Sequence, residues 1–355
     1  MGIYRLPNGI VGEASCLWGQ RASRLLSRTM LKPFQVVLNS AGRMPTRPTA
    51  RMAVLLSLII APVSIFGAPK NRVLPQLPGY KAVPVHYGPL NKMIISVRIN
   101  GQPANLLVDT GSNEIILDAD AAESFGVRPS QRGWRYIGFT EISGHLLPVV
   151  FVQSLTAGGM NFGSSPAVLR NSSLSGAGKA KVDGVLGLQT LFRHKAVINC
   201  RTKFVFFKTD YARQTNLVAA ALSAKFARVS LRREASGALT VPCAIRGQSA
   251  RLLVDTGAFV TTFSEAFFRS LGVASERTRV SAHFSSGATQ QMNAGRINDL
   301  AIGDFKVPPG KFGVAALPRF ALRQGSTRIS GILGIDTLYK CNAIIDLEGM
   351  NLFLK

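Results

Sequence analysis

The chain has 355 residues, of which 46% are hydrophobic and 17% are charged, so it is long and apolar enough to fill two domain cores. Its net charge is +24, but the basic residues are scattered, with no recognition-helix pattern and no zinc-finger spacing. This distribution indicates a basic, solvated surface and argues against a specific nucleic-acid site. A weak association with anionic envelope polymers or a membrane surface is the alternative use of this charge.

Residues 52–66 form the one sustained apolar run of the sequence. Three arginines precede it closely and small residues follow it, which is typical of a secretory signal peptide. We therefore interpret residues 1–67 as a basic leader with a signal peptide, and expect a secreted or periplasmic protein. An uncleaved membrane anchor at residues 52–66 is the alternative. Met44 would begin a well-formed signal, so we expect translation to start there.

The next stretch, residues 68–90, is rich in proline, which favours an extended tether or an edge segment. Apolar and polar residues then alternate over residues 93–99 and are followed by Asn100-Gly101, a strong signal for a β-hairpin. The second half of the chain repeats this pattern, with a strand over residues 239–245 and a turn at Arg246-Gly247-Gln248. The sequence therefore predicts a hairpin near the start of each of two similar units.

Helical patterns are short and fall at corresponding places in the two units. They are predicted over residues 119–125 and 264–271 and after two later Leu-Gly pairs, where Asp336 is expected to cap the last helix. An Ala-rich stretch between the units predicts a connecting helix. The expected organisation is a leader and signal (1–67), a Pro-rich tether (68–90), a first lobe (91–212), a linker helix (213–224) and a second lobe (225–355).

The hexapeptide Leu-Leu-Val-Asp-Thr-Gly occurs twice, at residues 106–111 and 252–257, with its copies 146 positions apart. A second motif follows each copy: Asp-Gly-Val-Leu-Gly-Leu at residues 183–188 and Ser-Gly-Ile-Leu-Gly-Ile at residues 330–335. From the Asp of the first motif to the first Gly of the second, the spacing is 75 residues in one half and 76 in the other. Two motifs in the same order at matching spacing indicate an internal duplication built around a carboxylate.

The repeated carboxylates, Asp109 and Asp255, are the candidate catalytic residues. Each follows a buried strand, and the Gly after it lets peptide N–H groups approach the carboxylate. Two carboxylates about 3 Å apart cannot both ionise, so they share one proton, as is known for aspartic proteases. The ionised member takes a proton from a water between them, and the protonated member polarises the scissile carbonyl. No covalent enzyme intermediate is needed.

The paired hydrophobic-hydrophobic-Asp-Thr-Gly and hydrophobic-hydrophobic-Gly motifs resemble aspartic proteases of the retropepsin-like type. More specifically, the chain resembles bacterial secreted proteins that carry two such domains in tandem, over about residues 90–355. The resemblance implies that the catalytic Asp falls on Asp109 and Asp255, and that the loop-threading Leu-Gly element falls on residues 185–187 and 332–334. The positions implied to support the two catalytic loops are Thr110, Gly111, Ser112, Thr256, Gly257 and Ala258.

The resemblance also implies an all-β fold with short helices, in which two closed-barrel lobes are related by a pseudo-twofold axis in a pepsin-like arrangement. The two threonines are expected to brace the catalytic loops across this axis. Ser112 follows the first Asp-Thr-Gly, whereas Ala258 follows the second and supplies no hydroxyl beside Asp255. Which Asp holds the shared proton is therefore open from the sequence.

Members of this family cover the cleft with flap hairpins, and an ordinary exposed hairpin is the alternative for each candidate here. The flap candidates are Tyr136, Gly138, Phe139 and Gly144 in the first lobe, and Phe284 and Gly287 in the second.

Other chemistries lack the residues they need. The four histidines have no metal-ligand spacing, so no metal or cofactor is expected. Cys200, Cys243 and Cys341 are expected to be small buried hydrophobic residues, with a Cys243–Cys341 bridge as the alternative. The sequence predicts a monomeric aspartic endopeptidase that acts on polypeptides. The rival hypothesis is a catalytically silent module that binds peptides or acts as a scaffold in the cell envelope.

Overall fold

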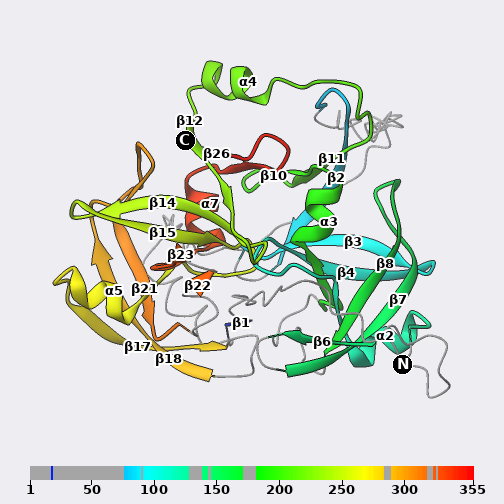
Figure 1. Ribbon diagram of the computed structural model, residues 1–355, viewed down its shortest axis with the longest axis horizontal. Helices are drawn as coiled ribbons and strands as arrows, with labels where there is room; N and C mark the ends of the chain where they lie inside the picture. The colour runs from blue at the N-terminus through cyan, green and yellow to red at the C-terminus, as the bar shows by residue number, and fades with distance from the viewer. Residues whose placement is uncertain are drawn as a thin grey trace, which may run out of the picture.

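The computed structural model describes residues 17–18, 76–88, 91–127, 138–142, 145–170, 181–283, 289–317, 323–324 and 327–355. The chain is mainly β-structure and forms two lobes that lie side by side, with the first half on the right of Figure 1 and the second half on the left. Within the described ranges, no helix is long and apolar enough to cross a membrane.

Lobe 1 is a closed ring of strands. Its strands are β2 (Tyr80–Tyr87), β3 (Met93–Ile99), β4 (Gln102–Asp109), β5 (Ile116–Asp118), β6 (Gly138–Ile142), β7 (His145–Ala157), β8 (Met160–Arg170), β9 (Gly184–Gly187), β10 (Val197–Asn199) and β11 (Phe204–Lys208). Six of them pair in the order β3–β4–β9–β5–β8–β7. The ring closes where Ile99 of β3 pairs with Leu155 of β7.

Lobe 2 repeats this order as β14–β15–β24–β16–β21–β18, and the short β19 that follows β18 closes the ring by pairing with β14. The strands are β12 (Ala227–Ser230), β13 (Arg232–Arg233), β14 (Leu239–Ile245), β15 (Gln248–Val254), β16 (Thr262–Ser264), β17 (Ser275–His283), β18 (Thr289–Ile297), β19 (Ala301–Ile302), β20 (Phe305–Lys306), β21 (Gly310–Ala315), β22 (Arg323–Gln324), β23 (Thr327–Arg328), β24 (Gly331–Leu333), β25 (Ile344–Asp346) and β26 (Asn351–Leu354). One further strand, β1 (Leu17–Trp18), pairs with β17. The two barrel lobes that the resemblance implied are therefore confirmed.

Both predicted hairpins are present. Asn100 and Gly101 adopt positive φ angles of 49° and 84°, and Arg246 and Gly247 adopt 50° and 73°. A positive φ at both central residues defines the tight turn whose twist matches the flanking strands. The second turn is shorter than expected, because Gln248 already belongs to β15.

The helices are single turns or little more: α2 (Ala119–Ser124), α3 (Leu188–Arg193), α4 (Leu217–Ser223), α5 (Glu265–Ser270) and α7 (Ile335–Lys340). The helix α4 lies within the segment expected to link the lobes. The prediction that Asp336 caps α7 is wrong, because the capping position is Gly334 and Asp336 lies in the first turn. Its carboxylate instead accepts hydrogen bonds from Thr261, an interaction that no local pattern announces.

A sheet of six strands joins the lobes, in the order β12–β26–β25–β10–β11–β2. Its centre is the antiparallel pair β10–β25, where Ile198 faces Ile345. Residues 80–87, within the stretch expected to be a tether, form β2 with partners on both sides, β11 and β3. Val83 and Val85 are buried there, so alternating apolar side chains outweigh the effect of the prolines.

Candidate active site

The loop that carries Asp109 begins where β4 ends, and the loop that carries Asp255 begins directly after β15. Each strand has a parallel neighbour from the Leu-Gly motif, β9 beside β4 and β24 beside β15. That neighbour also pairs with the strand that leaves the loop, β5 or β16. Both catalytic loops are therefore held between strands of a closed sheet, which fixes the direction in which each carboxylate points.

The last glycine of each Leu-Gly motif is required by close contact with the catalytic loop. A Cβ on Gly187 would overlap the carbonyl oxygen of Glu114, and one on Gly334 would lie 2.8 Å from that of Ala258. Real Cβ atoms do not approach backbone so closely, so only glycine fits. The amide of Ile335 also donates to Ala258 O at 2.8 Å, which ties the loop to the start of α7.

Thr110 and Thr256 connect the two loops through reciprocal buried hydrogen bonds. The Thr110 amide donates to Thr256 Oγ1 at 3.1 Å, and the Thr256 amide donates to Thr110 Oγ1 at 3.0 Å. Each hydroxyl donates across the interface in turn, to Val254 O and Val108 O, both at 2.8 Å. The loops therefore brace one another, and neither can shift without breaking bonds made by the other.

Asp109 is fully buried, and both of its carboxylate oxygens accept hydrogen bonds from its own loop. The Gly111 amide donates to Oδ1 at 2.7 Å, and the Ser112 hydroxyl donates to Oδ2 at 2.9 Å. Donors at both oxygens stabilise the charged form of a carboxylate. Asp109 is therefore the better place for the negative charge of the pair.

Asp255 is also fully buried, but its donors reach only one oxygen. Gly257 N and Ala258 N donate to Oδ1 at 2.8 and 2.9 Å, whereas the buried Oδ2 accepts no hydrogen bond within the described part of the chain. Burial raises the pKa of Asp255 well above its ordinary value, and the charge of Asp109 and a hydrogen bond shared with it raise it further. Oδ2 of Asp255 can therefore hold the shared proton and donate it toward Asp109.

The two loops cross so closely that each carboxylate lies against the glycine of the opposite loop. A Cβ on Gly111 would lie 2.5 Å from Asp255 Oδ2, and one on Gly257 would lie 2.5 Å from Asp109 Oδ2. Two acids that are 146 positions apart in sequence thus meet across the pseudo-twofold axis.

Thr261, which supports the second Asp-Thr-Gly loop, was not among the residues predicted for the site. Its hydroxyl bonds with Asp336 Oδ1 at 2.9 Å and Thr337 Oγ1 at 2.7 Å, and accepts from Gly334 N at 3.0 Å. The corresponding residue of the first lobe is the apolar Ile115, so the internal repeat hides this role. The signal that was present is the Asp-Thr pair directly after the second Leu-Gly motif.

Two of the flap candidates, Gly138 and Phe139, lie on β6 in a hairpin with β7, where Gly138 pairs with Val149. The other four, Tyr136, Gly144, Phe284 and Gly287, lie outside the described residues. In Figure 1 β6 and the β17–β18 hairpin lie along the same lower side of the molecule, opposite α4. The flap function of these hairpins stays a prediction.

Cys200, Cys243 and Cys341 are free, buried thiols, as the sequence favoured. Burial raises the pKa of Cys200 and of Cys243 to about 12 and that of Cys341 to about 11. Within the described ranges, no group of three or more His, Cys, Asp or Glu side chains is arranged to hold a metal ion.

Replacing Thr110 or Thr256 by Val should lower the free energy of unfolding by about 2 kcal/mol each, because a buried amide and a carbonyl lose their partner. The double variant should lose less than the sum, since both residues serve one reciprocal set of bonds. Urea unfolding of the single and double variants measures this coupling. Strictly additive losses would contradict the reciprocal arrangement.

The fold and the site together define the class of the protein. The family described as aspartyl protease matches residues 95–190 and 241–337, so each match holds one Asp-Thr-Gly loop and one Leu-Gly motif. These segments make up more than half of the chain, and the chain belongs to the aspartyl protease family. The expectation of two such domains in tandem is thereby confirmed.

Two solved structures are similar to the chain at low sequence identity. The aspartic proteinase from Irpex lacteus is 14% identical with a TM-score of 0.46, over 78% of this chain and 96% of that one. Basic 7S globulin from soybean is 10% identical with a TM-score of 0.46, over 79% and 95% of the respective chains. No curated protein matches the chain.

Proposed function

We propose that the protein is an aspartic endopeptidase that hydrolyses peptide bonds with a water held between Asp109 and Asp255. The observation that carries this proposal is the crossing of the two loops, in which each buried carboxylate lies against the opposite glycine. One carboxylate has donors at both oxygens, whereas the other has a buried oxygen that accepts no hydrogen bond within the described residues. Such a difference in environment assigns separate acid and base roles to two chemically identical groups.

In the proposed reaction, ionised Asp109 takes a proton from the water while the water oxygen attacks the substrate carbonyl carbon. Protonated Asp255 donates its proton to the carbonyl oxygen, which gives a neutral tetrahedral diol. The proton held by Asp109 then moves to the leaving nitrogen as the C–N bond breaks. A diol hydroxyl returns its proton to Asp255 as the carboxyl product forms, so the site is restored.

Activity should be present at acidic pH and fall as pH rises through the raised pKa of Asp255, because its acid role needs the proton. Stability should change in the same direction. Between the ordinary Asp pKa of about 3.9 and the raised pKa, the folded chain binds more protons than the unfolded one, so the free energy of unfolding falls with rising pH. In Asp255→Asn, the free energy of unfolding should fall less steeply with rising pH. Urea unfolding at several pH values measures this change.

The decisive test incubates the purified full chain with a mixed peptide library at several pH values, with and without a statine-type inhibitor that mimics the diol. Cleavage inside peptides that the inhibitor blocks supports an aspartic endopeptidase. Peptide binding without turnover at any pH contradicts it and favours a silent binding module of the cell envelope.

We also propose that the enzyme is exported to the periplasm or secreted and works as a monomer. The apolar run at residues 52–66 after a basic leader supports export. Both acids come from one chain and one continuous sheet joins the lobes, which supports action without a second copy. N-terminal sequencing of the protein from cell fractions tests export, since recovery only from the cytoplasm with residues 1–67 intact would contradict it.

A further inference from the structure

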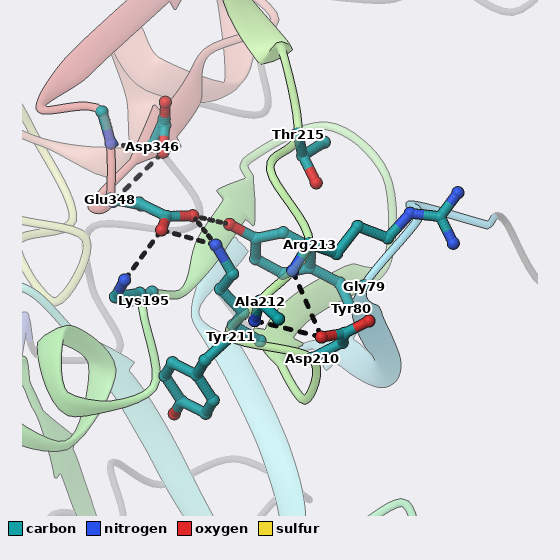
Figure 2. A network of polar contacts seen from close by, with 12 residues as sticks. Gly79, Tyr80, Lys195, Asp210, Tyr211, Ala212, Arg213, Thr215, Asp346 and Glu348 are labelled. Carbon is teal, nitrogen blue, oxygen red and sulfur yellow. Dashed lines mark hydrogen bonds and ion pairs between the residues drawn. The ribbon is translucent and has the colours of Figure 1, made fainter.

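Far from the catalytic loops in sequence, a single carboxylate of lobe 2 gathers three donors from lobe 1. Glu348 lies in the turn between β25 and β26, and Figure 2 shows its carboxylate facing Tyr80 and Lys195. Lys195 Nζ donates to Oε1 at 2.8 Å and the Tyr80 hydroxyl donates to Oε2 at 2.7 Å. Lys208 Nζ lies between the two oxygens, at 2.5 and 2.6 Å. We call this set of four side chains the interlobe clasp.

The clasp differs from an ordinary surface ion pair. The Lys208 side chain is only 3% exposed, although that of Glu348 is 29% exposed. Burial works against the charge of Glu348, but hydrogen bonds from Lys195, Lys208 and Tyr80 outweigh it and lower the pKa of Glu348 to about 2. The carboxylate therefore keeps its charge at the acidic pH where the proposed reaction runs. Multiple charge-assisted bonds of this kind also hold geometry better than a single pair.

The turn that presents Glu348 is itself held in place. Asp346 Oδ1 accepts from the amides of Glu348 and Gly349 at 3.1 and 3.0 Å, and Asn351 Nδ2 donates to Gly349 O at 2.8 Å. Asp346 also pairs with Val197 of β10, at one end of the β10–β25 strand pair. This strand pair joins the two lobes, and we call it the seam. Hydrogen bonds within the turn therefore fix the position of Glu348 in addition to its own contacts with lobe 1.

Within the described residues, the corresponding turn of lobe 1 makes no such set of ion pairs. Asn199 takes the place of Asp346, with its Oδ1 accepting from the amides of Arg201 and Thr202 at 3.0 and 2.9 Å. Arg201 therefore stands where lobe 2 has Glu348, and its guanidinium lies 4.4 Å from the ring centroid of Tyr339 instead. In the described part of the chain, the clasp therefore occurs at the Glu348 turn and not at the equivalent Arg201 turn. It does not follow from the internal duplication itself.

A short path of direct contacts leads from the clasp to Asp109. Lys195 lies two residues after the end of α3, and at the other end of this helix the Leu188 amide donates to Ser112 O at 2.7 Å. Ser112 in turn donates its hydroxyl to Asp109 Oδ2. Because α3 has only six residues, the contacts of Lys195 and those of the first Asp-Thr-Gly loop lie at opposite ends of one short helix.

We propose that Glu348 is a positioning residue. Through Lys195 and Lys208, it holds lobe 1 in the orientation relative to lobe 2 at which Asp109 and Asp255 share one proton. This inference rests on the proposed function. Glu348 does not touch substrate or the reacting atoms, and it acts through α3 and the seam. Catalytic groups lose rate steeply when misplaced by about 1 Å, so a small relaxation at the seam is expected to be visible in turnover.

The test compares Glu348→Gln in the full chain with Glu123→Gln, a matched control that removes an exposed carboxylate of α2 in lobe 1. The Glu348 variant should lower kcat about tenfold with KM changed less than about twofold. The alkaline limb of its pH profile should move to lower pH, because Asp109 would raise the pKa of Asp255 less. The control should match the wild type in all three.

Hydrogen–deuterium exchange gives a second readout that does not need activity. The amides of Thr110 and Thr256 donate across the lobes, and Glu348→Gln should speed their exchange whereas Glu123→Gln should not. Lys195→Met, which removes one donor, should act in the same direction more weakly. If wild-type turnover is absent, the proposed function fails, and the exchange rates alone test whether Glu348 positions the two loops. A Glu348→Gln chain whose exchange rates and pH profile equal those of the control would overturn the positioning role.

Discussion

Asp109→Asn and Asp255→Asn should each lower kcat/KM by about 10³-fold or more while the chain stays folded. Either change removes one of the two proton transfers on which the proposed reaction depends. Asn preserves the shape of the side chain and can still accept from Gly111 or Gly257, so the loops should keep their crossing. Stopped peptide-cleavage assays at the acidic optimum measure the loss.

The matched control for these variants is Asp304→Asn, which neutralises an exposed aspartate of lobe 2 and should leave turnover unchanged. The stability of the catalytic variants gives a second check. Asp255→Asn should be at least as stable as the wild type at neutral pH, because it removes a buried carboxyl whose charged form is disfavoured by burial and by Asp109. Full turnover by either variant would rule out the shared-proton mechanism.

Gly111→Ala and Gly257→Ala should be almost as damaging, although neither residue carries a reactive group. A methyl group at either position would lie 2.5 Å from Oδ2 of the opposite carboxylate, far inside the distance at which non-bonded atoms repel. Because the loops brace one another, a shift forced on one displaces both acids. We expect a loss of about 10²-fold or more in kcat, with destabilisation of about 1–3 kcal/mol from overpacking.

Gly310→Ala is the control for the glycine variants, since its new Cβ would meet the Phe312 ring at 3.7 Å, an ordinary contact distance. Its activity and melting temperature should match those of the wild type. A Gly257→Ala chain with wild-type kcat would mean that the carboxylates do not need the crossing seen here.

The catalytic loops could be predicted from the sequence because their determinants are local and repeated. Asp-Thr-Gly follows a buried strand in each half, and the Leu-Gly motif at matched spacing announces the strand that holds each loop. The hairpin at Asn100-Gly101 was equally readable, since the positive φ angles that the turn needs limit which residues suit it.

The sheet between the lobes could not be predicted in this way. Its central strand pair places Ile198 opposite Ile345, and the local sequence of neither strand predicts the other as its partner. The prolines near β2 hid a strand whose burial depends on that sheet. Glu348 looks like a surface residue in the sequence because its donor Tyr80 lies 268 positions away. The place of the shared proton was open for a similar reason, because it depends on both loops in contact.

The clasp also bears on whether the two halves could exchange roles. Within the described residues, the turn that carries Glu348 meets Lys195 and Lys208, whereas the corresponding turn carries Arg201, whose guanidinium lies over the Tyr339 ring. If two copies of the first half associated as the halves do now, Arg201 would meet both lysines with no acid among them. Like charges at such range disfavour that homodimer. The charge difference between the two turns therefore favours association of unlike halves over a symmetric dimer of two first halves.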